Sequence, residues 1–305
     1  MHSHARPVRR RQVLGGAVAL LAGGATSLLH LPLVAATPPP VSFTITNYPT
    51  GAGPYGMARG DLNGNGFQDI VIVNFTDGTI TILLNHGNGV LTPATNSPLK
   101  IPGGDGGFRI GTGYFDNTGK PAIVIVGFQH LTIFPNNTIA GSSTIALGTG
   151  VVANIGSVSA FAIGDVNGDG IQDIACALVA PSPPAPTNTG TITMLFGKGN
   201  GTFSVGPSFP VPVVAHSLAL HDLNGDGLPE LIASNTASTT RQDQLFVWNP
   251  TTSGGWAPAA GSPYTTSPYS GPAAIGILGT GQQPVIAVSC INTGPGGNVL
   301  DILQV

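Results

Sequence analysis

The stretch GDVNGDGIQD at residues 164–173 decides the fold, because it concentrates charge in a chain that otherwise carries little. Only 8% of the 305 residues are Asp, Glu, Lys or Arg, yet three acids fall within these ten positions. They alternate with Asn and Gly, which are typical of tight turns. Short apolar runs precede and follow the stretch, so it reads as an acidic turn between two β-strands.

The same unit occurs five times along the chain, and the five copies align without a gap. They begin at Gly60, Gly113, Gly164, His221 and Gly276, at spacings of 51 to 57 residues. A complete unit has one apolar run before the loop, two after it, a Gly-rich turn and a further extended stretch. Repeats of about 50 residues with four strands each are typical of propeller blades. We therefore expect an all-β protein, a β-propeller of five four-stranded blades.

The two ends of the repeat region complement each other. The last unit supplies only three apolar runs and finishes with NVLDILQV at residues 298–305. The segment VSFTITNYP at residues 41–49 has no acidic loop and reads as a lone strand. We expect this strand to complete the fifth blade, because closure of the ring would remove an exposed sheet edge. Residues 41–305 would then form one propeller domain.

Residues 1–36 read as an export signal. Three arginines at 9–11 precede an uncharged run from Val13 to Leu29, a pattern typical of a twin-arginine signal, for which we expect cleavage after Ala36. An uncleaved membrane anchor is the alternative, although the run is short for a span and broken by four glycines. The expected location is extracytoplasmic: the periplasm, the cell surface or the medium.

Removal of the signal would leave an acidic protein. Four of the ten Lys and Arg residues lie in it, which leaves six against 13 acids, a formal net charge of −7. Nucleic-acid binding needs basic patches and is not expected. We also expect a monomer that does not insert stably into a membrane. Cys176 and Cys290 lie far apart in apolar runs, which predicts buried free thiols rather than a disulfide.

The acidic loops predict cation sites. Eight of the 13 acids lie in three loops with the pattern D-x-N-G-[DN]-G-x-x-[DE]. Oxygens stand at positions 1, 3, 5 and 9, and glycines at 4 and 6 permit the positive φ of a tight turn. Calcium takes such oxygens in flexible geometry, whereas magnesium demands near-octahedral ligation. An EF-hand is excluded, since position 12 lacks Glu and the loops lead into strands. A metal-free Asx turn is the alternative, although its clustered carboxylates would repel each other.

The second and fifth loops are internal controls. Tyr114 and Ala122 replace the first and last oxygen ligands of the second loop, and Ile277 and Val285 replace those of the fifth. Both loops keep the flanking apolar runs, so the turn survives without its ligands. We therefore expect about three Ca²⁺ sites with a structural role.

The acidic loops, the GxGxF turn at residues 199–203 and the unit length resemble FG-GAP repeats, also called VCBS repeats, over residues 41–305. This family builds the β-propeller of integrin α subunits and of many bacterial exported proteins. Five blades are fewer than the family's common seven, and Glu230 stands where the family has Asp. The resemblance implies these side-chain ligands: Asp61, Asn63, Asn65 and Asp69; Asp165, Asn167, Asp169 and Asp173; Asp222, Asn224, Asp226 and Glu230. It also implies the backbone carbonyls of Phe67, Ile171 and Leu228.

The resemblance implies a binding or adhesion module for a glycan or a protein, whose identity the sequence leaves unknown. A polysaccharide lyase or hydrolase on the same propeller is the alternative, and a purely structural surface protein is a third hypothesis. No nucleophile or paired-carboxylate motif with defined spacing is present, so catalysis is not indicated. Asp105, Arg109 and His216 flank first strands of different blades and could meet near the channel.

The aromatic residues divide into two groups when the units are aligned. Trp248 and Trp256 fall at repeat positions that hold Leu or Phe in other units, so we expect them in the blade cores. Tyr264 and Tyr269 match no repeat position, and they are the better aromatic candidates for ligand contact.

Overall fold

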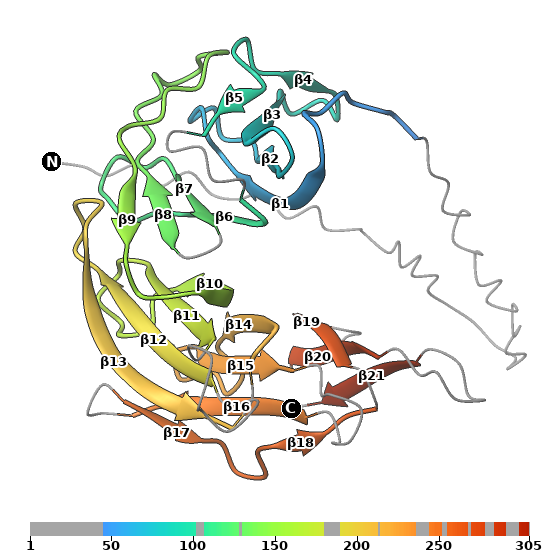
Figure 1. Cartoon of the computed structure of the whole chain (residues 1–305), viewed down its shortest axis with the longest axis vertical. Helices are drawn as coiled ribbons and strands as arrows, with labels where there is room; N and C mark the ends of the chain where they lie inside the picture. Colours follow the sequence, from blue (N-terminus) through green and yellow to red (C-terminus); the bar gives the residue numbers. More distant parts are fainter. Residues whose placement is uncertain are drawn as a thin grey trace, which may run out of the picture. The chain divides into compact units, whose positions relative to one another are not determined.

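The computed structural model (Figure 1) divides the chain into two units, residues 1–47 and Tyr48–Val305. Only residues 45–47 of the first unit are described, and every strand named below belongs to the second. The structure describes residues 45–101, 107–127, 130–179, 190–212, 214–235, 244–251, 255–267, 270–277, 284–290 and 299–304.

The strands form five antiparallel sheets, numbered here in chain order, and within each sheet successive strands pair. The first sheet contains β1 (Pro54–Gly60), β2 (Asp69–Asn74), β3 (Thr79–Asn85) and β4 (Leu91–Pro93), and β5 (Leu99–Lys100) also pairs with β3. The second contains β6 (Arg109–Gly113), β7 (Ala122–Val126), β8 (Leu131–Phe134) and β9 (Val151–Ala153). The third contains β10 (Val158–Gly164), β11 (Asp173–Val179), β12 (Gly190–Gly197) and β13 (Phe203–Val211). The fourth sheet contains β14 (Ser217–His221), β15 (Glu230–Ser234), β16 (Gln244–Pro250) and β17 (Trp256–Pro258), and β18 (Tyr264–Thr265) also pairs with β16. The fifth contains β19 (Ser270–Ile277), β20 (Pro284–Cys290) and β21 (Val299–Gln304). The all-β prediction is confirmed.

The strand register confirms the alignment of the five units. In every sheet the residue that begins the repeat unit pairs with the residue nine positions later, where the second strand begins or has just begun. The five pairs are Gly60 with Asp69, Gly113 with Ala122, Gly164 with Asp173, His221 with Glu230 and Gly276 with Val285. The repeat seen in the sequence is therefore one hairpin, made five times.

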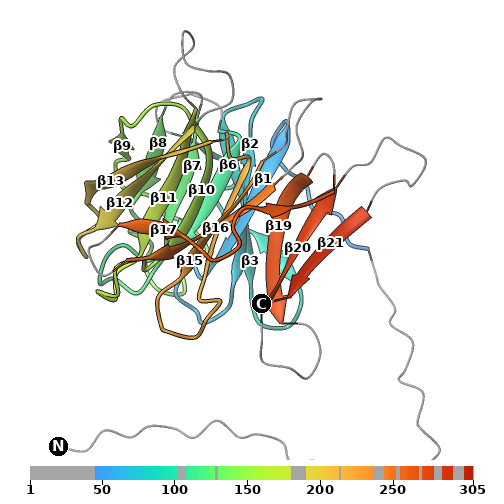
Figure 2. The same cartoon turned by 90° about the horizontal axis from the view of Figure 1, so that it is seen from below.

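Figure 2 shows the sheets packed side by side. Apolar side chains join each sheet to the next one in the chain. Each of the four core clusters combines residues from two consecutive sheets, for example Ile82 with Ile123, Ile133 with Ile174, Met194 with Phe246 and Val247 with Ile286. First strands also meet across the boundaries, β6 with both β1 and β10, and β14 with both β10 and β19. Sheets stacked face to face in series are characteristic of a β-propeller-like fold. The closed ring and the blade count stay predictions.

The expected N-terminal strand is not found where the structure describes its segment. Residues 45–50 are not in a strand, and Ile45 is 86% exposed. The fifth sheet contains β19, β20 and β21, with no fourth strand among the described residues. The chain that follows is tied to the first sheet instead, since the Leu91 N–H donates to the Tyr48 hydroxyl (3.3 Å). Residues 41–44 lie outside the described part.

The two tryptophans occupy blade cores, as the alignment predicts. Trp248 is 6% exposed and stacks on Phe246 with ring centroids 5.6 Å apart, and Trp256 packs against the same cluster. The prediction that Tyr264 contacts a ligand stays a prediction. The Tyr264 ring packs against the core between the fourth and fifth sheets, and its hydroxyl donates to the Ala260 carbonyl (2.7 Å). Tyr269 lies outside the described residues.

One of the two predicted free thiols can be checked. Cys176 lies on β11, is completely buried and forms no disulfide. Burial raises the pKa of its thiol, since the thiolate would lose its hydration. Cys290 is the last residue of β20, but its side chain is outside the described part.

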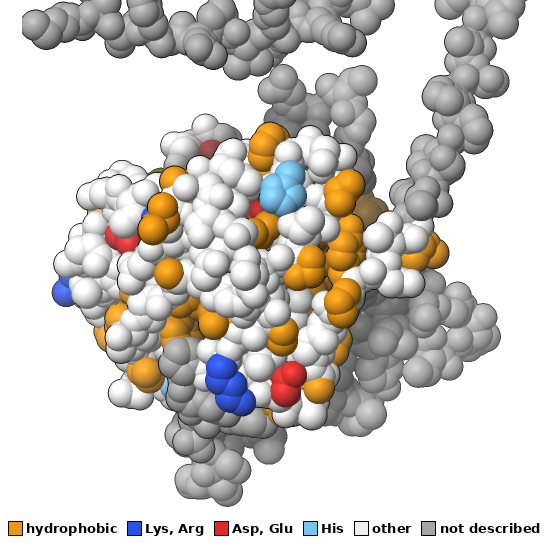
Figure 3. All heavy atoms as spheres, turned by 90° about the horizontal axis from the view of Figure 1, so that it is seen from above, with side chains coloured by type: hydrophobic (Ala, Val, Ile, Leu, Met, Phe, Trp, Pro, Cys, Tyr) orange, Lys and Arg blue, Asp and Glu red, His pale blue; other side chains and the backbone are white. Residues whose placement is uncertain are grey.

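The described surface carries little charge. The face in Figure 3 shows isolated Lys, Arg, Asp and Glu side chains among uncharged and scattered apolar ones. Among the described residues, no helix has the length and apolar character to cross a membrane.

Candidate functional site

The three acidic loops occupy equivalent places in their sheets. They connect β1 to β2, β10 to β11 and β14 to β15, and their ninth position is the first residue of the second strand. That residue is buried each time: Asp69 and Asp173 are 0% exposed and Glu230 is 2% exposed. The first, third and fifth positions lie in the turn itself. The hairpin thus places one carboxylate beneath a loop that carries the others.

A network of hydrogen bonds folds each loop around its own oxygens. In the third loop, Asp165 Oδ1 accepts the Gly168 N–H (2.7 Å) and its Oδ2 accepts the Gly170 N–H (2.8 Å). Asn167 Oδ1 accepts the Asp169 N–H (2.9 Å). The other loops repeat this pattern: Asp61 accepts from Asn65 and Gly66, and Asp222 from Gly225, Asp226 and Gly227. The three loops therefore share one conformation.

The glycines make this conformation possible. Gly168 and Gly170 have φ of 75° and 83°, a region that residues with a Cβ rarely adopt. The equivalent glycines of the other two loops also have positive φ, between 67° and 92°. The backbone can therefore double back and offer its N–H groups to the first carboxylate.

The buried carboxylate at position 9 connects three parts of the sheet. Asp173 accepts the Val166 N–H from the loop (3.0 Å) and the Gly197 N–H from the end of β12 (2.8 Å). Asp69 does the same with the N–H groups of Leu62 and Asn85, both at 2.9 Å. Each Asp thus joins the loop, the second strand and the end of the third strand.

Glu230 departs from this arrangement, as its identity suggested. Its Oε2 accepts the Leu223 N–H (2.7 Å), which reproduces the bond to the loop. Its Oε1 accepts a hydrogen bond from the side-chain amide of Asn224 at position 3 (2.7 Å). The extra methylene lets the carboxylate reach position 3 of the loop, so its relation to the expected ligands differs from that of the two aspartates.

The loops are electrostatically strained. The pKa of Asp173 is raised to about 6, mainly by burial and to a smaller extent by the nearby charges of Asp169 and Asp165, although the Gly197 and Val166 N–H groups oppose the rise. Burial, followed by neighbouring loop acids, also raises the pKa values of Asp69 and Glu230, although backbone N–H groups partly oppose the rise. A bound cation would relieve this repulsion.

The donor chemistry of the loops fits calcium, because every implied ligand atom is a carboxylate, amide or carbonyl oxygen. Among the described residues, no three Asp, Glu, His or Cys side chains converge closely enough to form a metal site by themselves. The expected sites therefore depend on Asn and backbone oxygens as well as on carboxylates. The ligand residues and the calcium ions stay predictions.

The second loop forms its turn without acids at positions 1 and 9. It connects β6 to β7, and Gly119 has a φ of 73°. Phe115 is buried at position 2 and contacts Phe203 edge to face, with centroids 4.9 Å apart. Lys120 stands at position 7 and its amine donates to the Thr138 carbonyl. The turn is kept without the first and last acid, as the sequence predicted. The packing of Phe115 and the Asp116 Oδ1, which accepts the Thr118 N–H (3.0 Å), both hold it. The fifth loop, residues 278–283, lies outside the described part.

The first loop is also bonded to the second sheet. The buried Asn136, just after β8, donates from its amide to the carbonyls of Leu62 (2.8 Å) and Pro121 (3.1 Å). The Gly141 N–H donates to the Asn63 carbonyl (2.7 Å). A predicted calcium loop thus shares hydrogen bonds with the neighbouring sheet.

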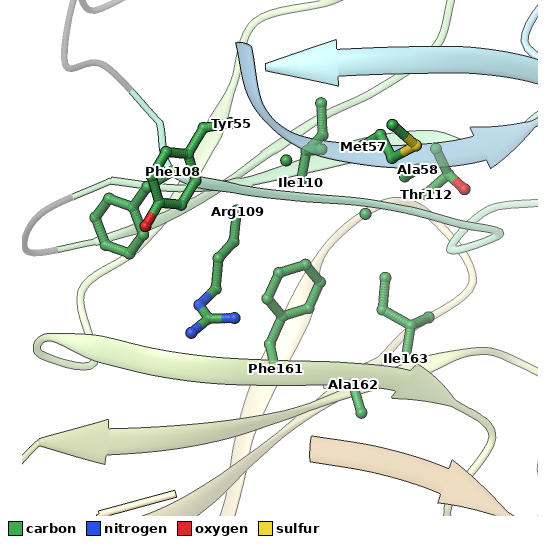
Figure 4. Close-up of a pocket in the computed structure, with 12 residues that line it drawn as sticks. Tyr55, Met57, Ala58, Phe108, Arg109, Ile110, Thr112, Phe161, Ala162 and Ile163 are labelled. Carbon is green, nitrogen blue, oxygen red and sulfur yellow. The ribbon is translucent and has the colours of Figure 1, made fainter. Parts of the chain in front are cut away.

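A separate pocket lies where the first strands β1, β6 and β10 come together (Figure 4). It has a volume of about 510 Å³, and Tyr55, Met57, Arg109 and Phe161 are among the residues that line it. Sequence reasoning named Arg109 but missed Tyr55, Met57 and Phe161. A signal existed, because Met57 and Phe161 occupy the same repeat position, three residues before the glycine that begins the loop.

The predicted approach of Arg109 and His216 is confirmed. Arg109 Nη2 donates to the backbone carbonyl of His216 (3.1 Å). Burial lowers the pKa of both side chains, and the charge of Arg109 lowers that of His216 further. The hydrogen bond uses the histidine backbone, so it does not make an acid–base pair. Asp105, the third residue of the hypothesis, lies outside the described part.

Consecutive antiparallel sheets, with an acidic loop after the first strand of several, define a β-repeat protein of the propeller-like class. Residues 61–125 and 165–233 match the model of the family described as FG-GAP-like repeat. These two segments are therefore similar to FG-GAP-like repeats. A search of curated proteins found no match.

Proposed function

We propose that this chain is an exported, calcium-stabilised β-propeller of five blades that binds a glycan or a protein outside the cytoplasm. The FG-GAP repeats support a binding or adhesion type of module, and the stacked sheets support a propeller-like scaffold. Loops and edges on such a rigid scaffold are where binding residues are commonly placed.

One observation carries the calcium part of the proposal. Three equivalent hairpins hold the same hydrogen-bonded acidic loop above a buried acid, and the equivalent second hairpin has neither its first nor its last acid. If the acids only shaped the turn, the second hairpin would need them too. Its turn forms with Asp116 at position 3, whose Oδ1 accepts the Thr118 N–H, and with the buried Phe115 at position 2. This difference separates turn formation from ligand retention.

Calcium in these loops would act on stability. Asp165, Asn167, Asp169 and Asp173 would hold it in the third loop, and its charge would offset their mutual repulsion. An ion present at tenfold above its dissociation constant stabilises the folded state by about 1.4 kcal/mol per site. Three such sites would contribute roughly 4 kcal/mol, a large part of the stability of a typical domain.

The test compares thermal unfolding and terbium luminescence with calcium and with excess chelator. Wild type should lose melting temperature in chelator, and the Asp165→Asn variant should show a smaller loss. Asp116→Asn, in the second loop, is the matched control and should behave as wild type. Equal melting temperatures of calcium-loaded and chelated wild type would contradict the calcium proposal.

The binding part needs its own test. The mature protein is applied, with calcium present, to an array of glycans and to a panel of extracellular-matrix and cell-surface proteins. We expect selective binding to one class. Absence of binding to every member would refute the binding function, and release of shortened products from polysaccharides would favour the enzyme hypothesis.

A further inference from the structure

The pocket at β1, β6 and β10 contains a cation with most of its hydrogen-bonding capacity unused. Arg109 is the only charged residue among the described residues that line it. Its guanidinium has five N–H donors, and the bond to the His216 carbonyl occupies one of them. Nε is buried and has no hydrogen-bond partner. A buried donor without a partner costs about 1–3 kcal/mol, so its presence at a pocket calls for a physical explanation.

The walls of the pocket suit a ligand with both polar and apolar faces. Tyr55 and Met57 on β1 are 74% and 73% exposed, which is unusual for such large side chains on a strand. Figure 4 shows the guanidinium of Arg109 between the ring of Phe161 and the pair formed by Tyr55 and Phe108. Aromatic rings next to a polar group are well suited to bind an amphipathic ring.

The strand edges add hydrogen-bonding groups. Among the described strands, β1, β6 and β10 each pair on one side only, with β2, β7 and β11, so each is an edge strand of its sheet. An edge strand presents free N–H and C=O groups. Hydroxyl groups both donate and accept, and can satisfy either kind. An extended peptide would instead need one long continuous edge, whereas this pocket uses short stretches of three strands.

The single positive charge of Arg109 favours a ligand with one negative charge. A guanidinium can pair bidentately with a carboxylate or a phosphate, but its single positive charge balances one carboxylate, whereas a phosphate monoester carries nearly two negative charges. We propose that this pocket binds a uronic-acid unit of an acidic saccharide, with Arg109 contacting the carboxylate and Tyr55 and Phe161 packing against the sugar ring. A small outward movement of Arg109 would present Nε to the same carboxylate. This inference rests on the proposed binding function and names its ligand class.

The experiment titrates the calcium-loaded protein with the methyl glycosides of glucuronic and galacturonic acid, and with the methyl ester of each, by calorimetry. Ester and acid differ in the charge of the carboxylate group and in one added methyl group. We expect at least one acid to bind about tenfold or more tightly than its ester, since a charge-assisted hydrogen bond contributes about 1.5–3 kcal/mol. N-acetyl-aspartate amide serves as the peptide-like anion and should bind more weakly.

The Arg109→Gln variant should lose the preference for the acid, and Arg109→Lys should retain part of it. Arg59→Gln is the control, because Arg59 lies on β1 but does not line the pocket. Equal affinity for acid and ester, an unchanged preference in Arg109→Gln, or tighter binding of the aspartate amide would each overturn the inference. If the array finds a partner but no sugar acid binds here, only the inference fails. If the array finds none, the binding function fails.

Discussion

The replacement of Asp173 by Asn tests the role of the buried acid most directly. The two side chains have nearly the same shape, but the amide has one acceptor oxygen where the carboxylate has two. In the wild type, the Val166 N–H donates to Asp173 Oδ2 and the Gly197 N–H donates to Oδ1. In the variant one of them loses its partner inside the protein, which costs about 1–3 kcal/mol.

The variant also removes an unfavourable buried charge. The pKa of Asp173 rises from 3.8 to about 6, mainly through burial. One pKa unit corresponds to about 1.4 kcal/mol, so at neutral pH the charged form costs the folded state about 3 kcal/mol relative to an unburied carboxylate. The two effects oppose each other and are similar in size. Without calcium, Asp173→Asn should therefore change the free energy of unfolding by less than about 2 kcal/mol.

Calcium should stabilise wild type more than Asp173→Asn. At a hundredfold above its dissociation constant, an ion stabilises wild type by about 2.7 kcal/mol, and a variant with an incomplete site gains much less. The assay is urea denaturation at pH 7.5, with and without calcium. A destabilisation of the same size in both conditions would refute the reasoning, because Asp173 would then be a structural acid only.

Three further predictions concern the loops and their surroundings. Phe115→Ala should lower stability by about 3–5 kcal/mol in urea denaturation, equally with and without calcium; a calcium-dependent loss would show that the second loop also binds ions. Gly227 has a φ of 92° and open space around it, so Gly227→Ala should cost about 1–2 kcal/mol from backbone strain alone, and an unchanged melting temperature would contradict this. The Thr79 hydroxyl and Ala52 N–H lower the pKa of Asp77, so its contribution is present above its unfolded pKa of 3.8 and is lost as pH falls through the lower folded value. Asp77→Asn should therefore lose less stability than wild type on acidification below about pH 4, and parallel pH profiles would count against it.

The local structure of the hairpins could be predicted from the sequence. Turn chemistry and strand alternation act over about ten residues, so the alignment of five units anticipated register pairs such as His221 with Glu230. The same alignment placed Trp248 in a blade core. Both results follow from short-range rules that each unit obeys separately.

Contacts between residues far apart in the chain were harder to predict from the sequence. The segment around Tyr48 had a strand-like pattern, but which sheet it contacts depends on residues far along the chain, such as Leu91. Tyr264 matches no repeat position, and only the structure shows that its hydroxyl donates to a carbonyl four residues away. The sequence showed a cation at Arg109, but only the packing of three sheets shows that its Nε lacks a partner.

The bonds from Asn136 and Gly141 to the first acidic loop have a dynamic consequence. Because Leu62 and Asn63 supply carbonyls to the second sheet, the loop cannot open without releasing part of that sheet. Local opening in proteins follows such cooperative units rather than single loops. An ion held between β1 and β2 would therefore slow amide hydrogen exchange beyond β8 as well. Metal occupancy at the first hairpin would then lower the rate of local opening in the second sheet.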